Sequence, residues 1–222
     1  MYKLSPSDFA YLWEDCKYCY YNKIKNGVML PSMPMPGLFS AINSRLQGNL
    51  VGKNLKMLSQ SLPDGQVINQ EGWVESVIIP GTDVFIKGKY DLLVENPDGT
   101  HTLIDLKISQ PGDDKIEKYK TQLGAYKFAL ENPKNGKPLN LTKLGLLIFY
   151  PDKVSFENET VLLDFPPKWL EVPIDDNHFV EFVKTVDALL AGVEPVGSAS
   201  CKWCVYKDYF LKAGEPVEDI PF

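Results

Sequence analysis

Histidine is scarce in this chain of 222 residues, which contains only His101 and His178. Two histidines cannot build a histidine-rich metal centre, and they give little support to a serine–histidine or cysteine–histidine nucleophile. No apolar run approaches the ~18 residues of a membrane span. The first residues also lack the apolar core of a signal peptide. We therefore expect a cytoplasmic protein that makes no contact with membranes.

Basic residues are the minority among the charged ones, with 23 Lys and Arg against 29 Asp and Glu and a net charge of −6. This balance argues against a broad basic surface made for duplex DNA, although it allows a local basic cleft. The hydrophobic fraction of 44% and charged fraction of 23% are those of an ordinary folded protein. The length suits one domain.

Apolar periodicity and turn residues predict a single α/β domain over residues 1–222, with a mixed central sheet flanked by helices. A helical amino-terminal part (1–60) precedes the sheet and its long helix (61–175), and a helix and tail follow (176–222). The predicted strands are Val67–Ile79, Val84–Glu95, Thr100–Ser109, Leu144–Tyr150 and an extended segment, Thr160–Ile174, interrupted by Pro166 and Pro167. The predicted helices are one that begins at Ser5, a mostly helical stretch from Gly37 to Gln60, Asp113–Leu130 and Asn177–Ala191, with a proline-rich loop at 31–36.

One predicted hairpin brings acidic residues together. Residues 97–99, Pro-Asp-Gly, fit a three-residue loop with glycine in the left-handed position. In that register Asp91 lies directly opposite Asp105, and Lys89 lies opposite Lys107. Directly opposed carboxylates, with Cβ atoms only ~4.5–5.5 Å apart, repel each other, and a divalent cation between them would relieve the repulsion. The alternative is a hairpin whose polar face simply meets water.

Three motifs in this region resemble those of the PD-(D/E)XK nuclease superfamily, and within it the RecB-type nucleases. They are Gly88-Lys89-Tyr90-Asp91, Ile104-Asp105-Leu106-Lys107 and Gln122-Leu123-Gly124-Ala125-Tyr126. The resemblance implies a restriction-endonuclease-like core in which Asp91 and Asp105 bind Mg²⁺ or Mn²⁺. It also implies that Lys107 positions the attacking water or steadies phosphate charge, while Gln122 and Tyr126 support the site and contact DNA. Ordinary core packing is the alternative for Tyr126.

One ligand of RecB-type nucleases is missing. Their helix before the strands usually carries a metal-binding histidine, and the matching residues 37–45 contain none. Asn43 could replace it through its side-chain carbonyl, an oxygen ligand suited to Mg²⁺, or be an ordinary polar helix residue. Glu75 is a further acid on the preceding strand, and its spacing does not settle which face it occupies.

The four cysteines form two C-x-x-C pairs, Cys16 with Cys19 and Cys201 with Cys204. Two such pairs in a cytoplasmic chain predict a four-thiolate metal site that joins the two termini. The alternatives are buried thiols or a redox pair. The positions resemble those of iron–sulfur nucleases of the CRISPR adaptation and AddB types, which implies a [4Fe-4S] cluster. This chain has two cysteines near each end, whereas those nucleases have one near the amino terminus and three near the carboxyl terminus. Zinc is therefore the alternative to the cluster.

The resemblance as a whole implies a Mg²⁺- or Mn²⁺-dependent deoxyribonuclease, an exonuclease that acts on single-stranded DNA or DNA ends. Its protein partners would belong to a phage recombination, DNA repair or CRISPR complex. The alternatives are a nuclease-like module that grips DNA ends and a subunit that cuts only within a complex. We also expect one local basic channel beside the acidic site, with aromatic residues that stack on bases.

Overall fold

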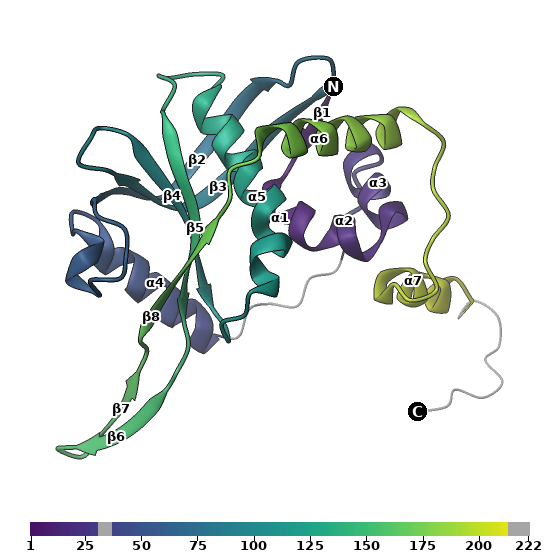
Figure 1. The fold of residues 1–222 in the computed structure, drawn as a ribbon. Helices are drawn as coiled ribbons and strands as arrows, with labels where there is room; N and C mark the ends of the chain where they lie inside the picture. The colour runs from purple at the N-terminus through teal and green to yellow at the C-terminus, as the bar shows by residue number, and fades with distance from the viewer. Residues whose placement is uncertain (31–36, 213–222) are drawn as a thin grey trace.

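The structure is a computed structural model that describes residues 1–30 and 37–212; the predicted proline-rich loop at 31–36 lies outside these ranges. The larger sheet contains β1 (Tyr2–Leu4), β2 (Gln66–Ile78), β3 (Val84–Glu95), β4 (His101–Ile108), β5 (Leu141–Phe149) and β8 (Pro167–Val172). The smaller sheet is a ribbon of β6 (Lys153–Glu157) and β7 (Thr160–Asp164). The helices are α1 (Pro6–Ala10), α2 (Leu12–Asp15), α3 (Lys17–Lys25), α4 (Gly37–Leu50), the 3₁₀ helix η1 (Leu55–Met57), α5 (Asp114–Glu131), α6 (Asp176–Ala191) and α7 (Lys202–Lys212) (Figure 1).

Strand β3 joins most of the sheet because both of its edges carry partners. Antiparallel β2 covers one edge from residue 85 to residue 95. Two shorter strands share the other edge: parallel β1 pairs with residues 84–86, and antiparallel β4 pairs with residues 92–95. Between them, residues 87–91 have no strand partner on this edge among the described strands. This gap is where the candidate site lies.

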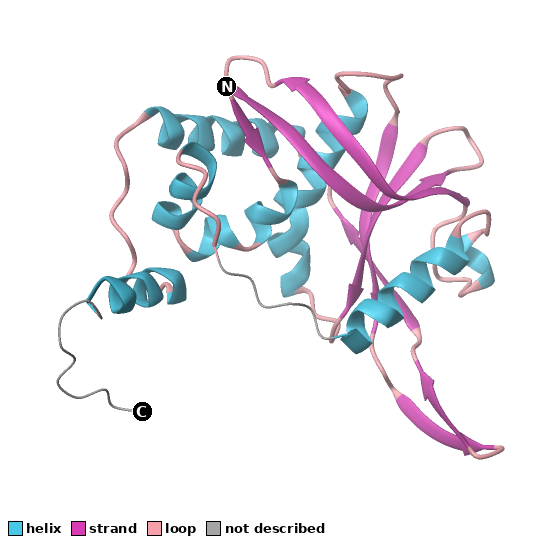
Figure 2. Cartoon of the chain, turned by 180° about the vertical axis from the view of Figure 1, so that it is seen from behind, coloured by secondary structure: helices cyan, strands magenta, loops and turns pink. Residues whose placement is uncertain are grey.

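Helices cover both faces of the sheet (Figure 2). On one face, α5 packs across the strands together with α1, α2, α3 and α6, and the larger hydrophobic cluster lies between them, with Leu103, Leu123 and Leu146 fully enclosed. On the other face α4 covers a smaller cluster that contains Leu50 and Ile104. Among the described residues, no helix has both the length and the apolar character that a membrane crossing requires.

Most predicted elements are confirmed. Strands β2, β3 and β4 match the three predicted strands to within a residue at each end, and α5 and α6 do the same for the two longer helices. The break at Pro166 separates β7 from β8. Strand β5 is parallel to β4 and antiparallel to β8, so the predicted mixed sheet is confirmed as well.

Four local predictions are wrong or incomplete. The helix predicted from Ser5 is three short helices, and the preceding residues form β1, which is too short to show a strand pattern. The helix that begins at Gly37 ends at Leu50 rather than continuing toward Gln60, because Gly52 adopts a left-handed conformation with φ of 80°. Strand β6 was not predicted. The tail is helical as α7.

Candidate active site

The register predicted for the acidic hairpin is confirmed where the strands pair. Leu92 lies opposite Ile104, and the ladder continues to Glu95 opposite His101. The loop closes as expected, with the backbone N–H of Asn96 donating to the carbonyl of Thr100 over 2.8 Å and with Gly99 at φ 79°. The sequence therefore specifies the turn and its register.

The direct opposition of Asp91 and Asp105 is wrong, because the ladder ends one pair earlier. Beyond Leu92 the side chain of Asp91 replaces a backbone partner: its Oδ2 accepts a hydrogen bond from the backbone N–H of Leu106 over 2.8 Å. Lys89 likewise does not pair with Lys107. It lies opposite Trp73 on β2, and its ammonium forms an ion pair with Glu71 at 3.1 Å. The two strands thus separate at the predicted metal ligands.

Asp105 is held at both carboxylate oxygens. The side chain is 7% exposed. Its Oδ1 accepts a hydrogen bond from Nε2 of Gln122 on α5 over 2.9 Å, and its Oδ2 forms an ion pair with Nζ of Lys107 at 2.6 Å. The carbonyl oxygen of the buried Gln122 side chain has no hydrogen-bond partner among the described residues. The structure therefore brings Asp105, Lys107 and Gln122 into one contact group.

Tyr126 fixes the unpaired part of β3. Its hydroxyl donates a hydrogen bond to the backbone carbonyl of Lys89 over 2.7 Å, within the gap between β1 and β4. The ring packs on Gly88, where an added Cβ would lie 3.1 Å from Cε1 of Tyr126 and 2.8 Å from Cδ of Pro6. Glycine at this position allows α1 and α5 to approach the strand. Tyr126 therefore packs in the hydrophobic core and also lines the pocket of the candidate site, while its expected contact with DNA stays a prediction.

Burial and mutual repulsion control the charges of the two acids. Burial, with a further contribution from the charge of Asp105, raises the pKa of Asp91 to about 6. Burial also raises the pKa of Asp105, although Lys107 and the Gln122 hydrogen bond oppose the shift. Burial alone would lower the pKa of Lys107, but the charge of Asp105 outweighs it and the pKa lies above its usual value. Such a carboxylate pair gains from a bound cation.

Two tyrosines that the motifs did not identify border Lys107. Its ammonium lies 4.5 Å from the ring centroid of Tyr119, one turn before Gln122 on α5. The hydroxyls of Tyr119 and Tyr11 lie 2.7 Å apart, and Lys118 lies 4.5 Å from the Tyr11 ring. The only sequence signal for Tyr119 is its place in the apolar stripe of the helix, which is indistinguishable from core packing.

The predicted site residues line a pocket of about 510 Å³ that opens beside the gap in β3. Asp91, Asp105, Lys107, Gln122 and Tyr126 all contribute to its wall. Lys3, Lys87 and Lys89 also line it, and so does Trp73, whose side chain is 73% exposed. Lysines of β1 and β3 therefore lie beside the acids, where a basic channel is expected, although Lys87 and Lys89 are ion-paired with Glu75 and Glu71.

A second pocket of about 440 Å³ also reaches Asp91 and Lys107. Its wall includes three aromatic residues, Tyr11, Phe39 and Tyr119. Asn43 of α4 lines this pocket, and its Oδ1 accepts a hydrogen bond from Nε2 of the buried Gln47 at 3.3 Å. Asn43 thus lies on the wall of the same cavity as Asp91, where the resemblance places the missing histidine.

Glu75 belongs to a surface ion-pair group. It binds Lys134 at 2.6 Å and Lys87 at 2.7 Å. Its hydrogen bonds to Lys134 and to Lys87 lower the pKa of Glu75 to about 2. Each carboxylate oxygen of Glu75 is thus paired with a lysine, and Glu75 does not line the pocket that contains Asp91 and Asp105.

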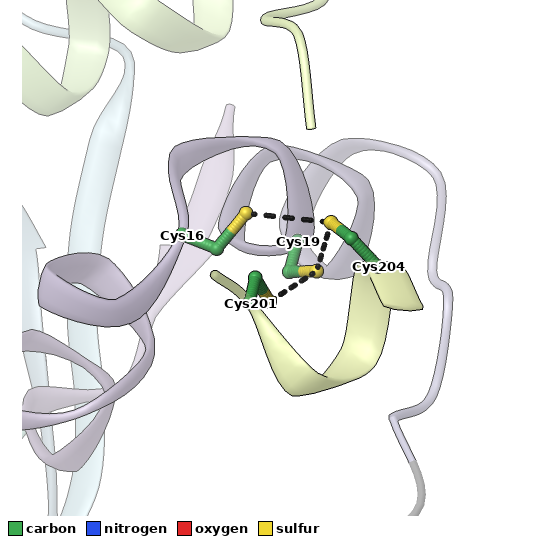
Figure 3. A group of neighbouring side chains, drawn as sticks. All are labelled: Cys16, Cys19, Cys201 and Cys204. Atoms are coloured by element: carbon green, nitrogen blue, oxygen red, sulfur yellow. Dashed lines mark hydrogen bonds between the residues drawn. The ribbon is translucent and has the colours of Figure 1, made fainter. Parts of the chain in front are cut away.

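The four cysteines, predicted to share one centre, lie together and are buried (Figure 3). Cys16 and Cys19 lie at the start of α3, and Cys201 and Cys204 lie at the start of α7. Their Sγ atoms all lie within 4.8 Å of one another, with separations of 3.6 Å for Cys19–Cys204 and 3.7 Å for both Cys16–Cys204 and Cys19–Cys201. Although burial opposes it, backbone hydrogen bonds lower the pKa of Cys16 to about 7, whereas burial raises the pKa of Cys19 and of Cys204. A thiolate is the form that binds metal.

Comparison with models of known protein families identifies one family for this chain. The sequence model of the PD-(D/E)XK nuclease superfamily matches residues 32–209. The crystal structure of SSO0001 is similar with a TM-score of 0.50, at 16% identity, over 93% of this chain and 84% of that one. An alkaline exonuclease (LHK-Exo) from Laribacter hongkongensis is also similar, with a TM-score of 0.46, at 14% identity, over 94% of each chain. No curated protein matches the sequence. The family match, together with the mixed sheet, confirms the restriction-endonuclease-like fold class.

Proposed function

The chain belongs to the PD-(D/E)XK nuclease superfamily, and from this premise we propose that it is an Mg²⁺- or Mn²⁺-dependent deoxyribonuclease that cuts single-stranded DNA or DNA ends. The catalytic group in this proposal is Asp91, Asp105 and Lys107, with Gln122 and Tyr126 as positioning residues.

The observation that supports the proposal most strongly is the arrangement around Asp105. One oxygen of its carboxylate is fixed by Gln122 and the other lies against Lys107, in a pocket that also contains Asp91. A buried pair of acids beside a lysine costs folding stability, so its presence suggests that the group serves a function other than folding. Metal binding is such a function, because a divalent ion compensates both negative charges.

In this proposal Asp91 and Asp105 would hold the metal ion, which supplies Lewis-acid stabilisation of the phosphate and lowers the pKa of bound water. The residues fit such an ion, since both offer carboxylate oxygens and both have pKa values raised in its absence. Lys107 contributes an ammonium that steadies charge on the phosphate or orients the attacking water. Gln122 keeps the Asp105 carboxylate in one orientation, and Tyr126 keeps β3 against α5.

The walls of the two pockets support a single strand or a frayed end as the substrate. Lys3, Lys87 and Lys89 of the first pocket can contact phosphates, and the exposed Trp73 can stack on a base. The net charge of −6 makes long-range attraction of a duplex weak, so this local charge has to supply the binding. In our proposal the bases face Trp73 and the backbone faces the lysines.

We propose a structural role for the four-cysteine site, with zinc as its ion. Four thiolates around one tetrahedral Zn²⁺ at ≈ 2.3 Å stand about 3.8 Å apart. The separations of 3.6 Å and 3.7 Å between neighbouring sulfurs support this arrangement. In a [4Fe-4S] cluster each thiolate binds a different iron outside the cube, which requires the sulfurs to stand farther apart. The resemblance to iron–sulfur nucleases favours the cluster, whereas the spacing favours a single ion.

Cleavage of end-labelled DNA tests the proposed activity. Single strands, blunt duplexes and duplexes with single-stranded tails are incubated with the purified chain in Mg²⁺, Mn²⁺ or EDTA. We expect metal-dependent shortening of single strands and tails, with blunt duplexes cut more slowly. Binding of ends without cleavage in any metal would instead support the DNA-end-binding module, and cleavage that appears only with added host extract would support the partner-dependent subunit.

A further inference from the structure

The ribbon of β6 and β7 projects beyond the end of the main sheet, on the side away from the cysteine site (Figure 1). Its strands pair in register from Lys153 opposite Asp164 to Glu157 opposite Thr160. Every residue of both strands is exposed. A two-stranded ribbon with no packed face is at best marginally stable in water, so an additional contact is expected to hold it.

The two faces of the ribbon differ in character. Val154 lies opposite Leu163, and Phe156 lies opposite Val161, so these four apolar side chains share one face. Their exposed fractions are 56%, 51%, 80% and 60% in the same order. The other face is polar apart from Leu162. Alternation of this kind is the pattern of a sheet that buries one face, yet no described residue covers the apolar one.

The turn fixes this arrangement. Asn158 and Glu159, which join the strands, have φ values of 47° and 62°. Two left-handed residues in succession define the tight hairpin turn that matches the twist of paired strands. Because Glu159 has a Cβ atom, the left-handed conformation is unfavourable for it. A tight turn of this type sets the register, which places the four apolar side chains on the same face.

Charge and size indicate what binds there. Between residues 152 and 164 there are four acids, Asp152, Glu157, Glu159 and Asp164, and one base, Lys153. Such a segment repels nucleic acid. Two copies of the ribbon packed face to face would bring the same acids against one another, which disfavours a dimer through this face. Neither Glu157 nor Glu159 forms an ion pair with any described residue, so both are available to bind basic groups of a partner.

We propose that the β6–β7 ribbon docks into an apolar groove of another protein, with Phe156 and Val161 in the groove and Glu157 and Glu159 against lysine or arginine side chains on its border. This docking site is separate from the cleavage site and does not depend on the nuclease proposal. The partner differs in sequence from this chain, and its groove is apolar with a basic border.

A photo-reactive phenylalanine derivative at position 156 of the full chain, expressed in its own host cells, tests the docking. Position 57 is the control, because Met57 is 74% exposed and lies outside the ribbon. We expect one protein to be cross-linked from position 156 and not from position 57, at a peptide that lines an apolar groove with lysine or arginine beside it. Cross-linking to nucleic acid, to a second copy of the chain, or equally from both positions would overturn the proposal.

Reconstitution with the purified partner provides the quantitative test. Phe156→Glu should weaken binding at least tenfold, and Met57→Glu should leave the affinity unchanged. Glu157→Lys combined with Glu159→Lys should also weaken binding, and reversal of the partner's basic residues should restore it. Cleavage of DNA by all these variants should equal that of the wild type, since none lies in the pockets at Asp91. Unchanged affinity after Phe156→Glu would contradict the docking surface.

Discussion

The side chain of Asp91 bonds to the backbone of Leu106 across the point where β3 and β4 separate, with 2.8 Å between Oδ2 and N. This bond uses one carboxylate oxygen as a substitute for a strand partner, and the other oxygen has no hydrogen bond to any described residue in the structure. Asp91 and Asp105 line the same pocket, which is where our proposal places the metal ion.

Removal of the second acid tests the metal site. Asp105→Ala should abolish cleavage in Mg²⁺ and in Mn²⁺, because it deletes a ligand that Gln122 and Lys107 hold in place. Without metal, the variant should be less stable than the wild type, because the largely buried ammonium of Lys107 loses its ion-pair partner. Product formation from labelled single strands and urea unfolding in EDTA measure the two effects. Wild-type cleavage rates in Asp105→Ala would refute the assignment.

The two lysines of the first pocket should differ in effect. Lys107→Ala should lower the single-turnover cleavage rate at least 100-fold, because Lys107 contacts Asp105. Lys89→Ala should weaken DNA binding by a few fold and reduce its dependence on salt, because Lys89 lies at the pocket wall with Glu71 as its only ion-pair partner among the described residues. Cleavage rates at saturating DNA, together with affinities at several salt concentrations, separate the effects. Equal rate losses in both variants would show that the motif lysine has no special role.

Two glycine-to-alanine substitutions, one at Gly88 and one at Gly48, test the packing that supports the site. Gly88→Ala places a Cβ 2.8 Å from Pro6 and 3.1 Å from Tyr126. It should cost ~1–3 kcal/mol of unfolding free energy and slow cleavage, because Tyr126 must move from the Lys89 carbonyl. Gly48→Ala is the matched control: nothing lies within 4 Å of the new Cβ in helix α4, so it should add about 0.5–1 kcal/mol. Urea denaturation measures both, and an equal response of the two variants would contradict the packing argument.

Turn chemistry and periodicity were sufficient to predict β3, β4, their register and α5, because Gly99 and the apolar stripe of α5 are local signals. They could not show that the ladder ends before Asp91, since that depends on how α1 and α5 meet β3 at Gly88. Trp73 and Lys3 were missed for the same reason, since they come from other elements and no motif contains them. Tyr119 was missed because its place in the apolar stripe of α5 is indistinguishable from core packing. The proximity of Cys16 and Cys204 could be predicted from the two C-x-x-C pairs alone, because a site of four thiolates does not depend on the sequence between the pairs.

The raised pKa of Asp91 predicts how stability depends on pH in the absence of metal. Its folded pKa of about 6 lies above its ordinary value of 3.8, so the folded state favours the protonated form. This contribution to stability is complete below pH 4 and is lost as the pH rises through 6. Relative to wild type in EDTA, Asp91→Asn should therefore gain stability between pH 4.5 and pH 7.5, by up to about 3 kcal/mol at about 1.4 kcal/mol per pKa unit.

An exposed aspartate provides the control for this pH effect. Hydrogen bonds from Thr100 lower the pKa of Asp98. The stability that the ionised Asp98 contributes is therefore lost only as the pH falls below about 4.5, outside the range in which Asp91 titrates. The difference between wild type and Asp98→Asn should be constant from pH 4.5 to pH 7.5. Urea midpoints at four pH values measure both variants. A constant difference for Asp91→Asn as well would show that the acid is not buried as described.

The cysteine site gives the last prediction, because its ion joins segments that lie 182 positions apart at Cys19 and Cys201. We expect anaerobically purified protein to be colourless and to contain one zinc per chain. Cys201→Ser should lose the zinc and lower the melting temperature by roughly 6–12 °C, since a cross-link worth about 3 kcal/mol is lost and each kcal/mol corresponds to ≈ 2–4 °C at this chain length. Ser200→Ala, an exposed neighbour, should retain both. Elemental analysis, visible absorption and thermal melts measure these outcomes.

Brown protein with about four irons would instead establish the [4Fe-4S] cluster, and the sulfurs would then have to stand farther apart than 3.7 Å. Protein with neither metal, and with an unchanged melting temperature in Cys201→Ser, would rule out a shared metal site.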